Sequence, residues 1–568
     1  MPPPTKPRIP EAKPIAPPAK PVLPAAPSQA FATCLSDDAA LLSDDAALLM
    51  VPSRSMDDPA YRNHGMRRAL DWYPSSPAPT TGNQVVTYLQ GTCAFADMAE
   101  ALASAFSAEH RIYLIGWSTN KDVQLKAGSN TKLEDYLVNT RAQVRGMFYD
   151  GHITLSPLIK ISTGVENKWV SDAINRTTQG ASVIDARLPP LGIHHQKLLV
   201  VQGQFGIVAF IGGMDFDPSR TEVNAGIGRP WHDTHIRLAG PAALECRKVF
   251  EDRWLDHPGT AALDQKLGAS ATATEAERRA IAFPSPAQLS IDDLPSSTMP
   301  LNSRHFKRRL HVAIGRTFAN LTKVKGTPYR FAPNGDFGAW GLIENGIKQA
   351  TRWIYLEDQY LVSRMARQAL LAKLRDTSFE YLLIVMNGSG AAAGDFKYLV
   401  TARNEFRRDL LAIDPKKSRW GMYTLTQPSD SERQKWCGNY VHSKTWVFDD
   451  GYVIIGSANC DSRGYTLDTE VVAGIADSDL IEVRLGASFA VDVRTSLWHK
   501  HLGVPHAQVR DWDKGIKFWR SPPSSAMIQD ASGYELDYDL TPPSNFPSAA
   551  DAKNVELAWT TVIDPDAR

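Results

Sequence analysis

An internal duplication constrains the fold of this chain more than any other feature of its sequence. Three blocks recur in the same order, namely HHQKLLVV (194–201), IVAFIGGMD (207–215) and WHDTHIRLAG (231–240), then VHSKTWVFDD (441–450), YVIIGSAN (452–459) and LDTEVVAGI (467–475). His-x-Lys matches His-x-Lys, GGMD matches GSAN, and Asp233-Thr234 matches Asp468-Thr469. The repeat predicts two similar halves, each of which contributes half of one structure.

Each half opens with the same local pattern, a helix followed by a buried strand. Apolar residues at helical spacing between Phe95 and Phe106 precede RIYLIGW (111–117), and AWGLIENGIKQA (339–350) precedes RWIYLEDQYL (352–361). Strands that alternate with helices favour an α/β class, so we predict two similar α/β halves with mixed β-sheets flanked by helices.

Composition divides the chain further. The first 30 residues are rich in Pro, Ala and Lys and cannot bury a core, and a stretch rich in Ala, Ser, Thr and Pro separates the two halves. We predict a disordered Pro-rich extension (1–84), a first half (85–255), a linker (256–303), a second half (304–505) and a C-terminal extension packed on the core (506–568).

The two His-x-Lys pairs are the candidates for chemistry. Residues two apart in a strand point to the same face, so His195 with Lys197, and His442 with Lys444, each present an imidazole and an ammonium together. Two such strands facing each other suit a phosphodiester, because one histidine can attack phosphorus while the other protonates the leaving oxygen. The lysines would neutralise the phosphate oxygens. This chemistry requires no metal and no other cofactor.

Other repeated residues are candidates to support these four. A histidine needs a fixed tautomer, which a carboxylate on the far ring nitrogen usually provides. Small residues let the backbone approach a phosphate, and an amide can donate to it. The carboxylate candidates are Asp233, Asp468 and Glu470. Asp468 and Glu470 would share a strand face, so the sequence does not choose between them. The phosphate-binding candidates are Gly213, Ser457 and Asn459.

The length of the second motif makes it specific. A single His-x-Lys pair is weak, because a histidine in a strand is most often structural and a lysine is usually solvated. After Lys444 come Asp449 and then Gly456-Ser457, and the pattern recurs in register in the first half, which makes coincidence untenable. We expect Asp449 to orient the strand or a neighbouring loop rather than to act in the chemistry.

These residues resemble the phospholipase D superfamily, whose pattern is HxKxxxxD followed by GS or GG. The resemblance extends over roughly residues 85–568 and is carried by GIHHQKLLVV, FIGGMDF, WHDTHIRLAGPAALECRKVFEDRW, YLEDQYL, VHSKTWVFDDGYVIIGSAN, DTEVVAGI, LWHKHLG and TVIDPD, which look like blocks of eukaryotic-type phospholipases D and their bacterial relatives. It implies two halves with their sheets packed together about a pseudo-two-fold axis. It also implies one site between them and a phosphohistidine intermediate, with His195 as nucleophile and His442 as acid.

The chain departs from that family at three places. Gln202 stands where the first motif usually has Asp, and Gly464 stands where the family often has Ser. No C2, PX or PH module fits before residue 85, so we expect no membrane targeting of the eukaryotic kind. If the aspartate of the motif is structural, Gln202 is tolerable.

The resemblance implies a phospholipase D of the phosphatidylcholine phosphatidohydrolase class, which hydrolyses or transfers the headgroup phosphodiester and yields phosphatidic acid. The alternatives are a phosphatidyltransferase of cardiolipin-synthase type, a nuclease of the same superfamily, and a binding module without activity. Lys plus Arg equals Asp plus Glu at 62 each, so no positive field favours nucleic acid and no such partner is expected. The intact His-x-Lys pairs argue against a binding module.

The expected setting follows from several absences in the sequence. The sequence lacks the apolar h-region of a classical signal peptide, and it lacks a run of about 18 apolar residues that would predict a membrane span. The five widely spaced cysteines indicate free thiols. We expect a protein that is cytoplasmic in the producing cell and peripheral at a phospholipid membrane when it acts. The blocks resemble toxins of type VI secretion, effectors exported without a classical signal peptide, for which secretion machinery or an immunity protein would be partners. The alternative is a cytosolic lipid-remodelling enzyme, and a role for calcium in membrane contact is left open.

Overall fold

The computed structural model describes most of the chain between residues 69 and 533. The described residues are 69–89, 91–126, 128–156, 159–162, 166–189, 192–221, 231–287, 310–323, 326–387, 397–425, 440–477 and 488–533. The closing TVIDPD block and most of the Pro-rich extension lie outside them.

Strands from both halves form one sheet. The first half contributes β1 (Thr80–Tyr88), β2 (Arg111–Gly116), β3 (Gln143–Tyr149), β6 (Gly180–Asp185), β7 (Leu198–Gly203), β8 (Gly206–Gly212) and β10 (His235–Ala239). The second contributes β11 (Leu310–Phe318), β12 (Asp336–Phe337), β13 (Trp353–Asp358), β14 (Tyr381–Met386), β15 (Trp420–Leu425), β17 (Thr445–Phe448), β18 (Tyr452–Gly456), β19 (Glu470–Asp477) and β20 (Ile528–Asp530).

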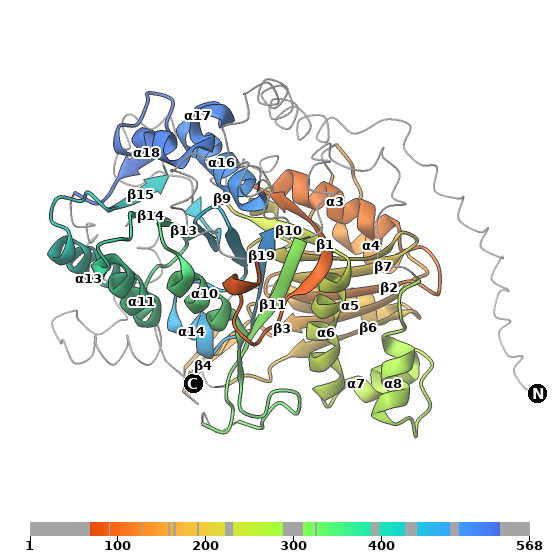
Figure 1. Cartoon of the computed structure of the whole chain (residues 1–568). Coiled ribbons are helices and arrows are strands. Elements are labelled where there is room, and N and C mark those ends of the chain that lie inside the picture. Colours follow the sequence, from red (N-terminus) through yellow and green to blue (C-terminus); the bar gives the residue numbers. More distant parts are fainter. Residues whose placement is uncertain are drawn as a thin grey trace, which may run out of the picture.

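The strand order of this 16-stranded sheet is symmetric about its middle (Figure 1). It runs β20-β15-β14-β13-β17-β18-β19-β11-β1-β10-β8-β7-β2-β3-β6, with β12 paired to β11. Outward from the antiparallel pair β1–β11, seven strands follow the same order in each half and end on three parallel strands, β2-β3-β6 in the first half and β13-β14-β15 in the second. The second half adds β20 at its edge, antiparallel to β15. The prediction of two similar α/β halves with pseudo-two-fold symmetry is therefore confirmed, and the sheets join edge to edge.

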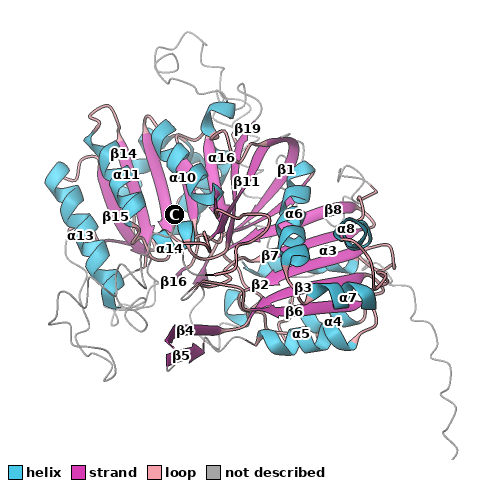
Figure 2. Cartoon of the chain, turned by 90° about the horizontal axis from the view of Figure 1, so that it is seen from below, coloured by secondary structure: helices cyan, strands magenta, loops and turns pink. Residues whose placement is uncertain are grey.

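Helices cover both faces of this sheet, as Figure 2 shows. They are η1 (Ala69–Trp72), α3 (Gly91–Ala103), α4 (Leu133–Val138), α5 (Asn167–Arg176), η2 (Pro218–Arg220), α6 (Pro241–Asp256), α7 (Thr260–Lys266), α8 (Glu275–Ala282), α10 (Gly338–Gln349), α11 (Arg364–Arg375), α13 (Lys397–Ile413), α14 (Ser462–Thr466), α16 (Phe489–Leu502), α17 (His506–Arg510) and α18 (Trp512–Arg520). Two short pairs stand outside the sheet, β4 (His152–Ser156) with β5 (Ile159–Ser162) and β9 (Trp231–His232) with β16 (Tyr440–Val441).

The strand pattern explains why both faces need cover. In β2, Tyr113 and Ile115 pack into the core that includes α6 and α16, whereas Ile112 and Leu114 pack into the core that includes α3. Side chains alternate between faces along a strand, so a run that is apolar at every position is buried on both sides. The buried run RIYLIG therefore requires a helix layer on each face.

Two predicted boundaries need correction. Residues 69–84 belong to the fold and not to the N-terminal extension, since Trp72 is 4% exposed and stacks on Tyr452 of the second half. Helices α7 and α8 lie in the predicted linker, where Asp264 forms a buried ion pair with Arg145 of the first half. Beyond residue 506, α18 and β20 pack on the second half, with β20 paired to β15. The other boundaries stay predictions.

Two smaller features concern the expected setting. Within the described residues, no helix is long and apolar enough to cross a membrane. Cys246 and Cys460 are free and buried. Cys93 is disulfide-bonded, so the prediction of free thiols is wrong for that residue.

Candidate active site

Each His-x-Lys segment is attached to a segment of the opposite half. The His442 N–H donates to the carbonyl of His232 at 2.7 Å, where β16 runs parallel to β9. In the same way, the His195 N–H donates to the carbonyl of Thr469 at 3.0 Å. These backbone bonds bring both motifs to the boundary between the halves.

Each histidine receives its carboxylate from the other half. His195 Nδ1 lies 2.8 Å from Glu470 Oε1, and His442 Nδ1 lies 2.7 Å from Asp233 Oδ2. A carboxylate on Nδ1 fixes the tautomer whose Nε2 carries the lone pair, so Nε2 is the atom left for substrate. All four side chains are buried.

The choice left open between Asp468 and Glu470 is resolved by these contacts. Asp468 accepts the N–H of Ile193 at 2.8 Å and pairs with Arg463 Nε at 2.6 Å, so it does not contact His195 directly. Glu470 is the carboxylate on the ring. Asp468 contacts the backbone that precedes the histidine and Arg463, and its charge contributes to the raised pKa of Glu470.

The register of the third repeated block also needs correction. The Gly213 N–H donates to the Thr234 carbonyl at 3.0 Å, and the matching Ser457 N–H donates to the Val471 carbonyl at 2.9 Å. Asp233, one residue before Thr234, is therefore equivalent to Glu470 and not to Asp468. The sequence match was shifted by two residues, and such a shift keeps every side chain on the same strand face.

The two lysines lie beside the histidines and are buried. Lys197 Nζ donates to the His195 carbonyl at 2.9 Å, lies 3.5 Å from Asp215 Oδ1 and sits over the Trp117 ring. Lys444 Nζ donates to the His442 carbonyl and to Gln359 Oε1, the latter at 2.9 Å. The acceptors that hold the two ammonium groups are thus mostly neutral, so the positive charges remain available to bind an anion.

Burial controls the protonation of the site. Burial, with the charges of Lys197 and Lys444, holds the pKa of His195 well below its ordinary value, and burial with Lys444 does the same to His442. Burial raises the pKa of Asp233 to about 7. The pKa of the histidine falls and that of the carboxyl rises, so the two groups of the pair Asp233–His442 compete for one proton across their 2.7 Å contact. A general acid needs such a proton.

The pKa of Lys444 is displaced as well. Burial lowers it to about 8, against the opposing effect of Asp233. At neutral pH the ammonium form still predominates. A phosphate arriving beside it would favour the charged form further.

Among the phosphate-binding candidates, two contact the carboxylates. The Ser457 hydroxyl donates to Glu470 Oε2. A Cβ on Gly213 would lie 2.0 Å from Asp233 Oδ1, so only glycine leaves room for that carboxylate. Asn459 is 6% exposed, and its Oδ1 has no partner within the described part of the chain.

The structure does not bring Asp449 or Gln202 to the histidines. Asp449 lies in the turn after β17 at a positive φ of 49°, and its carboxylate accepts the N–H groups of Thr351, Arg352 and Trp353 at 2.6 to 3.0 Å. Gln202 lies near the end of β7, where its Oε1 accepts from Arg247. Asp449 therefore binds the backbone at the start of β13.

Sequence comparison of the two halves missed two arginines. Arg220 contacts Asp215 Oδ2 at 3.1 Å and stacks over Trp231 at 3.5 Å, and its charge lowers the pKa of His442. Arg463 likewise lowers the pKa of His195 while it pairs with Asp468. Each arginine follows its GGMD or GSAN block by a few residues, so extending the comparison past those blocks would have found them.

Several known proteins are similar to this chain in sequence. A family model described as "Phospholipase D" matches residues 410–515, which include the second motif. Phospholipase D alpha 4 of Arabidopsis thaliana is 21% identical, over 70% of this chain and 62% of its own length. Phospholipase D alpha 1 of Zea mays is 24% identical (78% and 69%), and phospholipase D beta 2 of Arabidopsis thaliana is 25% identical (55% and 44%). The chain thus spans less than two thirds of some of these relatives.

Solved structures were compared as well. Phosphatidylserine synthase of Haemophilus influenzae is 13% identical with a TM-score of 0.46, over 73% of this chain and 87% of that one. Nuc of Salmonella typhimurium, a phospholipase D family member, is 18% identical with a TM-score of 0.21, over 31% of this chain and 90% of that one. The chain is thus similar to the phospholipase D family over residues 410–515, and its similarity to the plant alpha and beta types is distant.

Proposed function

We propose that the protein is a phospholipase D that hydrolyses the headgroup phosphodiester of glycerophospholipids and transfers the phosphatidyl group to alcohols. One observation carries the proposal. Two buried histidines from opposite halves each hold a carboxylate on Nδ1 and have a buried lysine two residues away. A site with two nucleophile or acid–base groups and two cations suits a phosphodiester better than an ester or a peptide.

In the first step, His195 Nε2 attacks phosphorus, and the bond from phosphorus to the headgroup oxygen breaks. His442 gives that oxygen its proton, and the headgroup leaves as an alcohol. Lys197 and Lys444 stabilise the charge on the non-bridging oxygens. The product is a phosphatidyl group on His195, while Glu470 stabilises the positive charge that the ring gains.

In the second step, water attacks phosphorus and His442 accepts the water proton. The bond from nitrogen to phosphorus breaks, and phosphatidic acid leaves with His195 restored. An alcohol can replace the water, because the intermediate accepts any nucleophile that reaches it. Hydrolysis and transfer thus share one intermediate. No step requires a metal, so calcium enters only as a possible aid to membrane contact.

The phospholipid substrate is supported by the names of the plant relatives and by the resemblance of the repeated blocks to those of phospholipases D. A cardiolipin-synthase-type phosphatidyltransferase would use the same intermediate with a lipid alcohol as acceptor. A nuclease would need an excess of cationic surface, and the equal numbers of acidic and basic residues disfavour that. We therefore rank phospholipid hydrolysis first.

The experiment is headgroup release from vesicles of phosphatidylcholine, phosphatidylethanolamine or phosphatidylglycerol, with plasmid DNA in parallel and with calcium or a chelator present. We expect headgroup release, intact DNA, and phosphatidylethanol when ethanol is added. DNA cleavage without headgroup release would replace the proposal with the nuclease. Phosphatidic acid as sole product at every ethanol concentration would contradict the shared intermediate.

For the biological setting, we propose a type VI secretion effector that acts on the membrane of another cell, with secretion machinery or an immunity protein as partners. The similarity of the sequence blocks to such toxins supports this. Expression with an added periplasmic signal should kill a bacterial host, and His442→Ala should abolish the killing. A harmless periplasmic wild type that still cleaves phospholipid in vitro would reject the effector and keep the lipase.

A further inference from the structure

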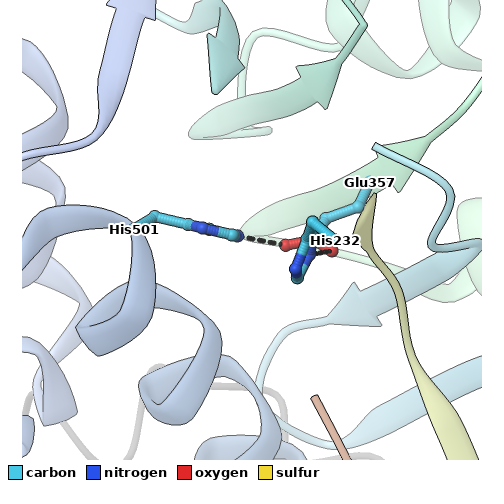
Figure 3. Close-up of side chains that lie close together, drawn as sticks. All are labelled: His232, Glu357 and His501. Atoms are coloured by element: carbon cyan, nitrogen blue, oxygen red, sulfur yellow. Dashed lines mark hydrogen bonds and ion pairs between the residues drawn. The ribbon is translucent and has the colours of Figure 1, made fainter. Parts of the chain in front are cut away.

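Glu357 lies at the centre of a buried cluster next to the candidate active site (Figure 3). Its Oε2 lies 2.7 Å from His232 Nε2, and its Oε1 lies 2.7 Å from His501 Nε2. His232 comes from the first half, Glu357 from β13 of the second, and His501 from the end of α16. All three side chains are at most 2% exposed.

Two hydroxyls complete the surroundings of this carboxylate. Ser443 Oγ donates to Oε2 at 2.5 Å, and the Tyr355 hydroxyl donates to Oε1. Each carboxylate oxygen therefore accepts from one imidazole and one hydroxyl, which is about as many donors as an ionised carboxylate can use. Although burial alone would raise the pKa of Glu357, His232 and His501 hold it well below its ordinary value.

The same three residues offer metal ligands, since their ligand atoms lie within 4.8 Å of one another. Two contacts favour a hydrogen-bonded anion instead. Both carboxylate oxygens already accept hydroxyls, and the His232 Nδ1 has no partner in the part of the chain that the structure describes. A metal-bound histidine almost always donates its other ring N–H to an acceptor.

The cluster is joined to both members of the pair Asp233–His442. His232 directly precedes Asp233, and its carbonyl accepts the N–H groups of His442 at 2.7 Å and Ser443 at 3.2 Å. Ser443 stands between His442 and Lys444. Glu357 therefore binds both His232, the neighbour of Asp233, and Ser443, the neighbour of His442. In this way it fixes the distance within the pair Asp233–His442.

The first half has a different residue at the equivalent place. Leu198 and Thr445 each follow their histidine by three residues. The strand partner of Leu198 is Ile115, and the strand partner of Thr445 is Glu357. The counterpart of Ser443 is Gln196, which donates to the Glu470 carbonyl. In the described residues, a buried carboxylate at this strand position is thus confined to the His442 side of the site, whereas on the other side the buried Asp185 contacts His194, the residue before His195.

We propose that Glu357 is a positioning residue for the general acid: by holding His232 and Ser443 it fixes Asp233 against His442, and so makes the two histidines of the pseudo-symmetric site unequal. This rests on the proposed function. It also links the end of α16 to the chemistry, because His501 binds the same carboxylate.

The test compares Glu357→Gln with the wild type on two substrates that differ in their leaving group. The measured quantity is the rate of leaving-group release in single-turnover experiments. Choline from phosphatidylcholine needs a proton from the acid, whereas p-nitrophenol from phosphatidyl-p-nitrophenol does not. We expect a loss of about 10- to 100-fold on phosphatidylcholine, a range typical of such supporting partners, and less than about threefold on the nitrophenyl ester. His501→Gln, which retains a donor, should lie between wild type and His501→Ala.

Two outcomes would overturn this inference. Equal losses on both substrates, at an unchanged melting temperature, would mean that Glu357 does not act through the acid. One equivalent of zinc in the purified wild type, absent from Glu357→Gln, would make the cluster a metal site. A wild type that releases neither leaving group would instead refute the proposed function.

Discussion

Glu470→Gln and Asp468→Asn form a matched pair that tests how the carboxylates are assigned. The sequence makes the two equivalent, but the structure puts Glu470 2.8 Å from His195 Nδ1 and leaves Asp468 on Arg463. Burial holds the pKa of Glu470 well above its ordinary value, so its charge matters most when the His195 ring becomes cationic. Glu470→Gln then loses a charge-assisted hydrogen bond to the nucleophile. Such bonds contribute about 1.5–3 kcal/mol. At about 1.4 kcal/mol for each factor of ten, kcat/KM should fall roughly 10- to 150-fold.

Asp468→Asn should cost much less. It frees the charge of Arg463, which would lower the pKa of His195 further, but that ring is already neutral because burial holds its pKa well below the ordinary value. The nucleophile stays in its active form, and we expect a loss below about tenfold. The assay is kcat/KM for headgroup release at pH 7, with melting temperatures as a check on folding. If Asp468→Asn costs as much as Glu470→Gln, the contact at 2.8 Å is not the one that serves the nucleophile.

Three further predictions concern the rest of the site. His195→Ala and His442→Ala should each remove nearly all turnover, and the double variant should be no worse than the worse single one; substantial activity in either single variant would refute the two-histidine mechanism. Because the pKa of Lys444 is lowered to about 8, kcat/KM should fall as pH rises through that value and the ammonium loses its proton; a flat profile to pH 10 would contradict this. Asp449→Asn should lower stability by about 1–3 kcal/mol, since the amide nitrogen that replaces Oδ2 cannot accept the N–H of Thr351, whereas Gln202→Asp should change turnover by less than about threefold; a large gain from Gln202→Asp would show that the first motif is impaired.

Much of this architecture could be predicted from the sequence. The repeat predicted two halves because each block keeps the local pattern of a buried strand followed by a chemically distinct loop. It predicted the pairing of His195/Lys197 with His442/Lys444 as one site, and the structure brings both motifs to the boundary between the halves. Local pattern and residue chemistry sufficed for these inferences, since both are properties of short segments.

The sequence could not supply the register between distant segments. A two-residue shift leaves a carboxylate on the same strand face, so Asp468 and Glu470 looked alike until hydrogen bonds distinguished them. Nor did composition reveal that Trp72 stacks on Tyr452, because that contact joins residues far apart in the chain. A stretch rich in Ala, Ser and Thr likewise concealed α7 and α8, and Asp264 of α7 contacts buried partners in the first half.

The exchange of carboxylates between the halves has a consequence for biosynthesis. His195 depends on a residue 275 positions later, and His442 on one 209 positions earlier. A ribosome that has made the whole first half has therefore made a nucleophile without its carboxylate. Under the proposed mechanism, a chain that ends before Glu470 lacks the carboxylate of its nucleophile, so activity should appear only after the second half has been made and has joined the first.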